Sequence, residues 1–384
     1  MRTEVITRRA ELLPLEEDWR KLHEEAECPE LHDGWEWTLS CLDTLRGPEP
    51  ELFVIAVYDG ERCVCIAPLC IERRRVGLLK VRSLRPINHG TTPYNHFLIH
   101  REYHIRNLLQ PVANALFERR GCWDFAELTN FSSKHSLTFL LRQVLETRYP
   151  VFTAEASMTT YVEPLRMIKR NKREMHNIER RERGLRKKHR VDVRIDVPYS
   201  RELWEKLLEW NKARWADSRF HDPEYNRFFE SLLDRMKRAG QLSFSCIDID
   251  GETESISLDF KFGDKVYGEM MNSKPGGKSG TGMILTHRML EHFALRGIAE
   301  YDFQEGDQEH KFYWTDSVRK NYHFYVCGKN GKSAYLAFCT WLKVAARQNK
   351  QLNNLKRRAF ALRSSLNPSR KESKGSHVEN SGFA

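Results

Sequence analysis

The chain has 384 residues, of which 40% are hydrophobic and 11% aromatic, and it carries a formal net charge of +10. This length allows two domains of ordinary size, and this apolar content excludes a globally disordered chain. No window approaches the ~18 uninterrupted apolar residues of a membrane span, and residues 1–9 are too charged for a secretory signal. We therefore expect a cytoplasmic protein whose positive charge indicates an acidic partner or surface.

Residues 1–155 are predicted to form a mixed α/β unit. Apolar periodicity and turn residues place, in chain order, a helix over 12–25, a helix over 35–44, a hairpin of strands 51–58 and 63–69, a strand over 81–87, a helix over 105–120, a strand over 123–128 and a helix over 134–146. The helix at 105 follows His104 and has no glycine-rich loop before it. Any phosphate-binding loop is therefore expected in the second half of the chain.

Two polar stretches of this first half need an interpretation. The charged run from Glu72 to Arg75 is most simply a solvated strand end or loop. Residues 89–96 form a polar loop that contains His89 and His96. This loop either contacts a substrate or only connects two elements, and the second interpretation is favoured.

The nine cysteines are scattered and include no Cys-x-x-Cys pair. Cys63 and Cys65 lie two apart in a predicted strand, a spacing that places both on one face. Reduced thiols in a cytosolic core are the simplest interpretation, and neither a disulfide nor a metal site is expected.

Residues 165–194 are the most charged segment, with 13 Lys or Arg residues against 4 acidic residues. A thin apolar stripe predicts a long basic helix or a helical hairpin here. Three interpretations stay open: a solvated cover over a domain junction, a contact for an anionic polysaccharide, lipid-linked phosphate or membrane surface, and a contact for RNA phosphates. Nucleic acid is the less favoured anionic partner.

The second half is predicted to place a glycine turn between a sheet and a helix. We expect helices over 200–215 and 222–238, strands over 242–249, 253–262 and 265–272, a helix from the turn to Gly297, strands over 299–303 and 322–327, and a helix over 334–347. Glycine lets the backbone approach a ligand closely, and the first turn of a helix has unpaired N–H groups. A pyrophosphate or similar anion is therefore expected at Ser279, Gly280, Thr281, Gly282 and Met283.

A dense polar cluster follows this helix. It consists of Asp302, Glu305, Asp307, His310 and Lys311, more ionisable residues than a strand end normally requires. Groups that perturb one another's pKa values are what a catalytic site uses, and structural networks have the same composition. A buried salt bridge, for instance between Asp307 and Lys311, is therefore the alternative to a catalytic cluster.

The second half also resembles the C-terminal signature of the CelD-like acetyltransferases, a family of the GNAT superfamily. That signature reads Ser-Pro-Gly, an apolar helix, Gly, Asp-Phe and Gly-Asp-x-x-Tyr-Lys-x-x-Trp. It is matched here by Gly282, Leu285, Gly297, Asp302-Phe303, Gly306-Asp307, Lys311 and Trp314. Two positions depart from it, because Ser279-Gly280-Thr281-Gly282 replaces Ser-Pro-Gly and His310 replaces the Tyr.

The resemblance runs from about residue 10 to about residue 345 and implies an α/β fold of tandem GNAT-like mixed-sheet domains with a basic helical connector. This architecture is related to that of the Fem-type peptidyltransferases. The implied division is a degenerate N-terminal GNAT-like domain over 1–155, the connector over 156–200 and a GNAT acyltransferase domain over 201–350. Residues 364–384 are rich in Ser, Lys, Asn and Gly, so we expect a disordered tail.

The activity that the resemblance implies is transfer of an acyl group from acetyl-CoA or another acyl-CoA to an amine or hydroxyl. The implied acceptor is a sugar of a polysaccharide or of its precursor. The reaction needs a bound thioester, a donor that polarises its carbonyl group and a base for the nucleophile. Backbone N–H groups of 269–272 are the candidate donors, and the candidate catalytic residues are Glu269, Asp302, Asp307, His310 and Lys311.

Two other functions remain open from the sequence. One is a Fem-like aminoacyl-tRNA-dependent ligase, in which the basic segment 165–194 holds tRNA. The other is a non-catalytic binding or assembly protein, in which the ionisable cluster is purely structural.

Overall fold

The computed structural model describes residues 1–47, 50–170, 172–328 and 331–348, and the chain divides into two compact units, 1–328 and 329–384. The described part of the second unit is the helix α12 (Gly331–Gln348), where a helix is predicted. The predicted disordered tail, 364–384, lies outside the described residues. None of the described helices combines the length and the apolar character that a bilayer crossing needs.

The first half of unit 1 contains the helices and the hairpin predicted for it. Its helices are α1 (Arg9–Leu12), α2 (Glu16–Glu25), α3 (Trp35–Thr44), α4 (Ile105–Glu118) and α5 (Ser136–Glu146), with 3-10 turns η1 (Leu13–Leu15) and η2 (Leu31–Asp33). Its strands are β1 (Arg2–Ile6), β2 (Glu51–Leu52), β3 (Val54–Asp59), β4 (Arg62–Ala67), β5 (Leu69–Val76), β6 (Leu79–Pro86), β7 (Leu98–Ile99), β8 (Phe125–Ser132) and β9 (Val151–Val162).

The second half of unit 1 follows the predicted order of helices, meander, helix and strand. Its helices are α6 (Pro164–Arg170), α7 (Lys172–Arg186), α8 (Arg201–Arg214), α9 (Pro223–Arg238), α10 (Thr281–Leu295) and α11 (Glu309–Phe312), with the 3-10 turn η3 (Arg219–His221). Its strands are β10 (Val191–Val197), β11 (Leu242–Ile249), β12 (Glu252–Phe262), β13 (Lys265–Ser273), β14 (Glu300–Glu305) and β15 (Val318–Cys327). Side-chain caps define two helix starts, since Ser200 accepts from Leu203 N–H and Asp222 from Glu224 N–H.

One order of elements occurs twice within unit 1. It is a strand, two helices, three strands, a helix, a strand, a helix and a strand. The first copy runs β1, α2, α3, β3, β4, β5, α4, β8, α5, β9, with β6 returning from β5 as a hairpin. The second copy runs β10, α8, α9, β11, β12, β13, α10, β14, α11, β15. The chain is therefore a tandem mixed α/β protein, as predicted.

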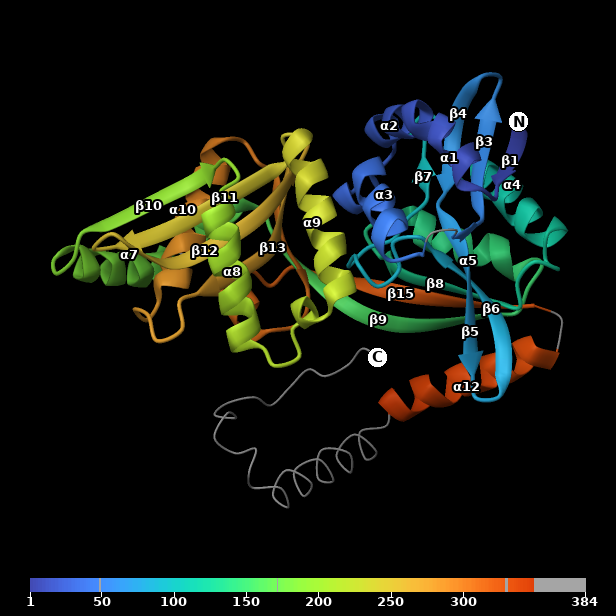
Figure 1. Ribbon diagram of the computed structural model, residues 1–384. Coiled ribbons are helices and arrows are strands. Elements are labelled where there is room, and N and C mark those ends of the chain that lie inside the picture. Colours follow the sequence, from blue (N-terminus) through green and yellow to red (C-terminus); the bar gives the residue numbers. More distant parts are fainter. Residues whose placement is uncertain (48–49, 171, 329–330, 349–384) are drawn as a thin grey trace, which may run out of the picture. The chain divides into compact units, whose positions relative to one another are not determined.

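The two copies share one sheet of eleven strands, in the order β10-β11-β12-β13-β14-β9-β15-β8-β6-β5-β2. The last strand of each copy lies within the other copy's part of this sheet. β9, which ends the first copy, pairs with β14, and β15, which ends the second copy, pairs with β8. The two last strands also pair with each other, and both are long strands that cross the middle of unit 1 (Figure 1). A separate sheet has the order β1-β3-β4-β7.

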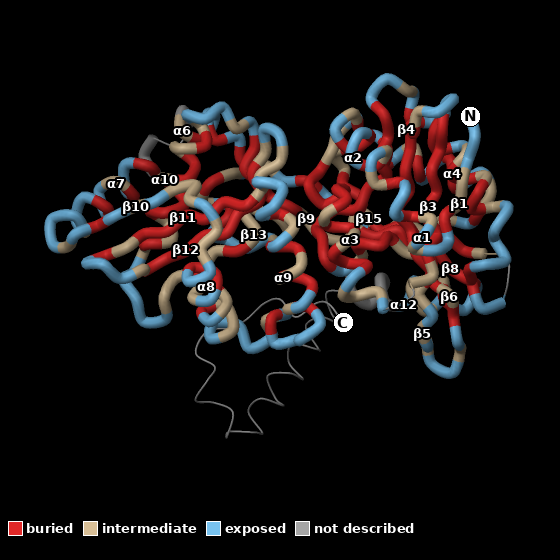
Figure 2. The backbone as a smooth tube through the Cα atoms, turned by 45° about the horizontal axis from the view of Figure 1, so that its top comes forward, coloured by how far each residue is buried: buried red, intermediate tan, exposed pale blue. Residues whose placement is uncertain are grey.

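The hydrophobic core follows the sheet, since the buried backbone runs mainly along the strands (Figure 2). One core cluster joins helices of both copies, for example where Trp37 of α3 lies 6.1 Å, ring centre to ring centre, from Phe228 of α9. Another core cluster joins α10 to α6 and α7 through Met167, Ile178 and Ile284. The basic segment therefore buries its apolar stripe against α10.

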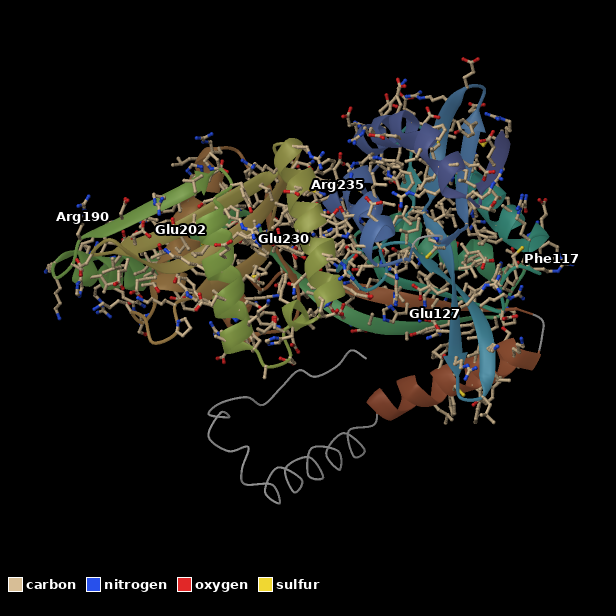
Figure 3. All side chains as sticks on the ribbon, viewed as in Figure 1. Phe117, Glu127, Arg190, Glu202, Glu230 and Arg235 are labelled. Carbon is tan, nitrogen blue, oxygen red and sulfur yellow. The ribbon has the colours of Figure 1, made fainter. Side chains whose placement is uncertain are left out.

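The basic segment 165–194 was predicted to be helical over its whole length. Its helices end at Arg186 instead. Val191–Val197 forms β10, an edge strand that pairs with β11. Val191 and Val193 pack into the core beside α10 while Asp192 is exposed, a period-2 pattern that the high charge of the segment conceals. Arg190 lies in the turn between α7 and β10, at the left of Figure 3.

The charged run from Glu72 to Arg75 is the exposed end of β5 rather than a loop, and it pairs with β6. Two of its arginines form ion pairs with glutamates of other strands, Arg73 with Glu51 and Arg74 with Glu127. Glu127 lies on β8, which is next to β6 in the sheet, and it also pairs with Arg85 (Figure 3).

The polar loop 89–96 connects β6 to β7, and its residues 91–96 are buried. One smaller prediction of the first half needs correction. Cys63 and Cys65 do not share a face: a register shift in the β3–β4 pair puts them in different core clusters. All nine cysteines are free thiols.

Candidate functional site

A glycine-capped helix start follows the last strand of the meander. Gly280 is the N-cap of α10, and its φ of 83° lies in the left-handed region that glycine adopts without strain. None of the described side chains caps this helix start. The backbone N–H groups of residues 281–283 are therefore the unpaired donors of the first turn, and they suit an anion.

The loop before α10 is fixed by a carboxylate and by hydroxyl groups. Glu254 of β12 accepts a hydrogen bond from the backbone N–H of Lys278 (2.5 Å). The buried Thr281 hydroxyl accepts from the Ser255 hydroxyl (2.8 Å) and donates to the Lys278 carbonyl oxygen (3.1 Å). Thr281 therefore offers a ligand its backbone N–H group, since its hydroxyl is already engaged inside the protein.

Arg181 of the basic helix α7 lies across the glycine N-cap. A Cβ atom on Gly280 would sit 2.5 Å from Arg181 Nη1 and 2.8 Å from its Cδ, so only glycine leaves room for this side chain. Arg181 is exposed, and its guanidinium forms no ion pair with the residues that the structure describes. A cation thus lies beside the helix start that suits an anion. Gly282 is also confined, because its Cβ would lie 3.3 Å from Ser273 Oγ.

β13 and β14 diverge next to this helix start. They pair in parallel only over Lys265–Tyr267 and Glu300–Asp302. On its other edge β14 pairs with β9 as far as Glu305, and β13 continues to Ser273 on β12. From Glu269 onward, the edge of β13 that faces β14 has no strand partner in the described part of the chain. Unpaired strand edges of this kind can hydrogen-bond an extended ligand.

Glu269 occupies a β-bulge at the point of divergence. The register between β12 and β13 shifts there, and Glu269 is the extra residue on β13. Its carboxylate accepts a hydrogen bond from Gln304 Nε2 (2.7 Å), and Gln304 itself has a positive φ of 59°, which is unusual for a residue with a side chain. Burial raises the pKa of Glu269, and the Gln304 bond opposes that rise. A partly buried carboxylate with a raised pKa suits general-base chemistry.

Asp302 is fully buried at the end of the β13–β14 pairing. Its Oδ2 accepts a hydrogen bond from the Tyr94 hydroxyl, and its Oδ1 accepts one from the Gln304 N–H (2.6 Å). Arg319 Nη1 lies 3.8 Å from Oδ2. Burial raises the pKa of Asp302 to about 6, against the opposing effects of Tyr94 and Arg319. With both oxygens engaged, Asp302 fits the role of a residue that fixes Gln304 rather than that of the base.

Lys311 is the centre of the ionisable cluster that follows β14. Its buried Nζ donates to the carbonyl oxygens of Gln304 (3.2 Å) and Glu305 (2.5 Å), so it fastens the chain after Asp302. Burial lowers the pKa of Lys311 to about 8, while Asp302, Glu305 and Asp307 oppose that change. The predicted cluster is thus brought together.

The two remaining candidate residues of the cluster, Asp307 and His310, are exposed.

Two residues of this region, Tyr94 and Gln304, had no predicted role, and Arg181 was expected only as one of the basic residues of 165–194 that would hold tRNA. Nothing in the sequence places Arg181 at the glycine turn. Tyr94 lies in the loop interpreted as a connection, although an aromatic residue within a polar loop is a signal that it is buried. Gln304 carries no signal, because a positive φ cannot be read from a glutamine.

A hollow of about 450 Å³ lies between the start of α6 and the segment after α11. It is lined in part by Glu163, Arg166, Phe312 and Trp314. None of the candidate catalytic residues lines it, so the hollow is separate from the strand divergence.

Residues 171–312 match the family model described as an acetyltransferase (GNAT) domain. The match contains all ten residues predicted for catalysis and cofactor binding, and Arg181 as well. No curated protein matches the chain.

Three solved structures share the fold of this chain. FemX is 13% identical, with a TM-score of 0.55 and coverage of 86% of this chain and 98% of its own. The C-terminal domain of a putative lysylphosphatidylglycerol synthetase from Agrobacterium fabrum is 11% identical, with a TM-score of 0.52 and coverage of 85% and 95%. L-PGS from Bacillus licheniformis is 10% identical, with a TM-score of 0.51 and coverage of 85% and 96%. The chain therefore has the tandem mixed α/β fold of these proteins, and its residues 171–312 match a GNAT acetyltransferase domain.

Proposed function

We propose that the protein is an acyltransferase that takes its acyl group from acetyl-CoA or another acyl-CoA. This proposal is based on the N-terminus of α10. The helix begins after Gly280 without a side-chain cap, beside the point where β13 and β14 diverge. The helix start would bind the phosphates of CoA, and the unpaired edge of β13 would bind its extended arm. The match of residues 171–312 to a GNAT acetyltransferase domain supports the same chemistry.

Phosphate binding would rest on the backbone of 279–283 together with Arg181. Backbone N–H groups and a guanidinium both donate hydrogen bonds to phosphate oxygens, and those to a charged group are the stronger kind. Arg181 is well placed for this role because it lies against Gly280 and is exposed to an incoming ligand.

Glu269 is proposed as the general base. It would take the proton from the acceptor amine or hydroxyl as that group attacks the thioester carbonyl carbon. The thiolate of CoA leaves when the tetrahedral intermediate collapses. Backbone N–H groups near 269–272 would hold the carbonyl oxygen, as such donors do in other acyl transfers. Asp302 and Lys311 are proposed to hold Gln304 and the chain around it in place.

The acceptor is proposed to be a sugar of a polysaccharide or of its precursor, in a cytoplasmic reaction. The support for this is the resemblance of Gly282, Asp302-Phe303 and Gly306-Asp307 to the CelD-like signature. We further propose that the first copy, β1 to β9, is a degenerate copy that serves structure or acceptor binding, that α6 and α7 connect the two copies, and that the second copy, β10 to β15, carries the acyl-CoA site together with Arg181 of α7. These bounds replace the division at 155 and 200 that the resemblance implies, because β9 and β10 extend into 156–200.

Calorimetric titration with CoA tests the phosphate site. We expect Arg181→Ala to weaken CoA binding at least about tenfold, because it removes a charge-assisted contact worth roughly 1.5–3 kcal/mol. Arg180→Ala is the matched control, since Arg180 is the neighbouring exposed arginine of α7 and does not lie over Gly280. Equal affinities for the two variants would remove Arg181 from the site, and no heat from wild-type protein would remove the acyl-CoA proposal.

Transfer from an aminoacyl-tRNA is the second candidate function. The exposed face of α7 and the residues after it favour it, since they carry Arg180, Arg181, Arg186 and Lys187. A gel-shift titration with tRNA at several salt concentrations tests this function. Tight binding that falls steeply with salt and is lost when these four residues are neutralised would support it, and absence of a shift at low salt would exclude it.

A further inference from the structure

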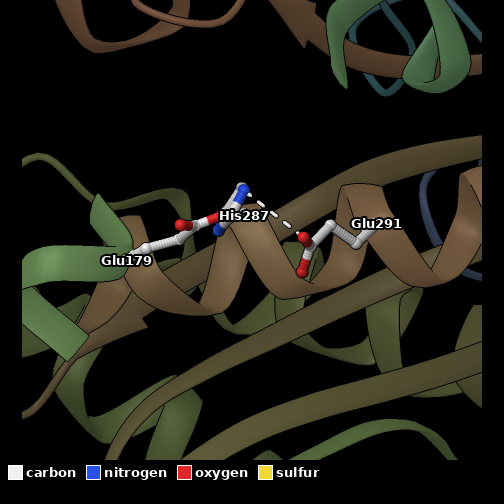
Figure 4. A group of neighbouring side chains, drawn as sticks. All are labelled: Glu179, His287 and Glu291. Carbon is white, nitrogen blue, oxygen red and sulfur yellow. Dashed lines mark ion pairs between the residues drawn. The ribbon is translucent and has the colours of Figure 1, made fainter. Parts of the chain in front are cut away.

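His287 of α10 is a buried histidine whose ring lacks ordinary hydrogen-bond partners. Its side chain is almost completely buried, and its Nδ1 has no hydrogen-bond partner within the described residues. Its Nε2 lies 3.7 Å from Glu291 Oε1, beyond hydrogen-bonding distance (Figure 4). Buried polar groups are nearly always paired, so an unpaired imidazole calls for a ligand that the protein chain does not supply.

Two carboxylates flank this imidazole. Glu291 lies four residues after His287, so both project from the same face of α10. Glu179 reaches the ring from α7 (Figure 4). One nitrogen of His287 and one oxygen of each glutamate all lie within 4.8 Å of one another. Imidazole nitrogen and carboxylate oxygen are the donors that bind zinc and similar divalent metals.

The surrounding cations leave these donor atoms available. Arg288 Nη1 binds Oε2 of Glu291 (2.7 Å), so Oε1 is the atom that faces His287. Among the described residues, Arg183 Nη1 lies 3.8 Å and His176 Nδ1 lies 3.9 Å from Glu179 Oε2, both at the limit of an ion-pair distance.

We propose that Glu179, His287 and Glu291 bind a divalent transition metal of the zinc class between α7 and α10. Zinc bonds of about 2.0–2.2 Å put tetrahedral ligand atoms roughly 3.3 Å apart, so the ligand atoms, which lie within 4.8 Å of one another, need to close by at most about 1.5 Å. Three protein ligands leave a fourth position for water. The site is distinct from the acyl-CoA site.

The metal ties the basic helix to the helix whose N-terminus forms the candidate anion site. Arg181 lies two residues beyond Glu179 on α7, and it crosses Gly280 at the start of α10. A metal bound between the two helices therefore fixes α7 on α10 and with it the position of Arg181.

Zinc titration by calorimetry tests the site directly. Untagged protein is first treated with a chelator and then titrated with Zn²⁺ alone. We expect wild-type protein to bind one Zn²⁺ more than either Glu179→Gln or Glu291→Gln, or to bind it at least about tenfold more tightly, because each variant loses one ligand. His221→Ala is the matched control, since it removes an exposed histidine of η3, outside α7 and α10, and it is expected to bind like wild type.

Cobalt substitution gives a second readout that requires no variant. Co²⁺ bound to one nitrogen and two oxygens in a four-coordinate site gives strong visible absorption, whereas octahedral surface-bound Co²⁺ gives little. We expect strong absorption in wild-type protein, displaced by Zn²⁺. Equal zinc binding by wild type and both glutamine variants, or the absence of the cobalt absorption, would overturn the proposal.

Discussion

Glu269 is the residue on which the proposed chemistry rests. A general base contributes about 10²–10⁴-fold to a rate. We therefore predict that Glu269→Gln lowers kcat by about that factor while CoA affinity changes little, since the side chain does not belong to the phosphate site. Acetyl transfer from acetyl-CoA to a panel of amine and sugar acceptors measures kcat, and calorimetry measures the affinity. Glu252→Gln, an exposed glutamate of β12, is the matched control.

The pH dependence follows from the same residue. The base must be ionised, and burial raises the pKa of Glu269 above its ordinary value of 4.5. The rate should therefore fall as the pH is lowered through that raised pKa, and the acid limb should lie above pH 4.5. Glu269→Gln should lose this limb. A variant that keeps both the rate and the limb would show that another group is the base.

Residue roles could be read from the sequence only in part. Glu269 was a candidate because it lies in the third strand of a predicted meander, a position that local patterning can identify. The position of its partner, the Gln304 side chain, depends on the positive φ angle of that residue. The contact of Tyr94 with Asp302 joins residues more than 200 apart in the chain. Neither depends on local propensity, so neither has a signature in the sequence.

At the scale of elements, the start of α10 depends on Gly280. Alanine at a φ of 83° is strained, and its Cβ would lie 2.5 Å from Arg181 Nη1. We predict that Gly280→Ala lowers the free energy of unfolding by about 1–3 kcal/mol and weakens CoA binding, because Arg181 must move away. Urea denaturation and calorimetry measure the two effects. Gly121→Ala, at a glycine with open space and an ordinary φ, should change neither the free energy of unfolding nor the CoA affinity. Wild-type values of both quantities in Gly280→Ala would contradict the role given to Gly280.

Most elements could be predicted because their signals are local. α3 and α9 have apolar periodicity, and the meander has turns at Asp250-Gly251 and Gly263-Asp264. β10 and β5 were missed because charged residues on their exposed positions outweigh the alternation that defines a strand. Their charges are satisfied by partners distant in sequence, such as Glu127 for Arg74, which no local pattern contains.

At the scale of the whole of unit 1, a buried ionic contact joins the two copies of the repeated element order. Glu30 of the first copy accepts a hydrogen bond from the Tyr267 hydroxyl (2.6 Å) and lies 2.9 Å from Lys134 Nζ and 3.3 Å from Lys265 Nζ. Removing one partner of a buried pair leaves the others uncompensated, which costs about 3–5 kcal/mol. We predict a loss of this size in unfolding free energy for Glu30→Gln, and almost none for the exposed Glu27→Gln.

The same contact has a defined pH dependence. The pKa of Glu30 is held well below 4.5 by His135, Lys265 and Lys134, despite the opposing effect of burial. A lowered carboxyl pKa stabilises the fold above the unfolded-state pKa, and that stabilisation is lost as the pH falls toward the native value. The stability difference between wild type and Glu30→Gln should therefore shrink below about pH 4.5. A difference that is independent of pH would contradict this role of the charge.

The exchange of last strands between the two copies is the feature of the whole molecule that the sequence does not reveal. β15 was predicted in part, over 322–327, whereas no strand was predicted at β9 (Val151–Val162). Which strand each one pairs with depends on contacts between residues far apart in the chain, such as Tyr322 with Phe131. The tandem organisation was predictable from the repeated order of elements, and the shared sheet was not.

The proposed acyl transfer requires that the phosphates of CoA bind at the start of α10. Calorimetric titration with CoA tests this binding most directly. Gly282→Asp places a negative charge and a side chain where the backbone meets the ligand, beside Ser273. Gly121→Asp adds the same charge at an exposed glycine in open space. We predict that wild type and Gly121→Asp bind CoA alike, and that Gly282→Asp binds at least about tenfold more weakly, a difference of about 1.4 kcal/mol or more. Equal affinity in all three folded proteins would contradict the account.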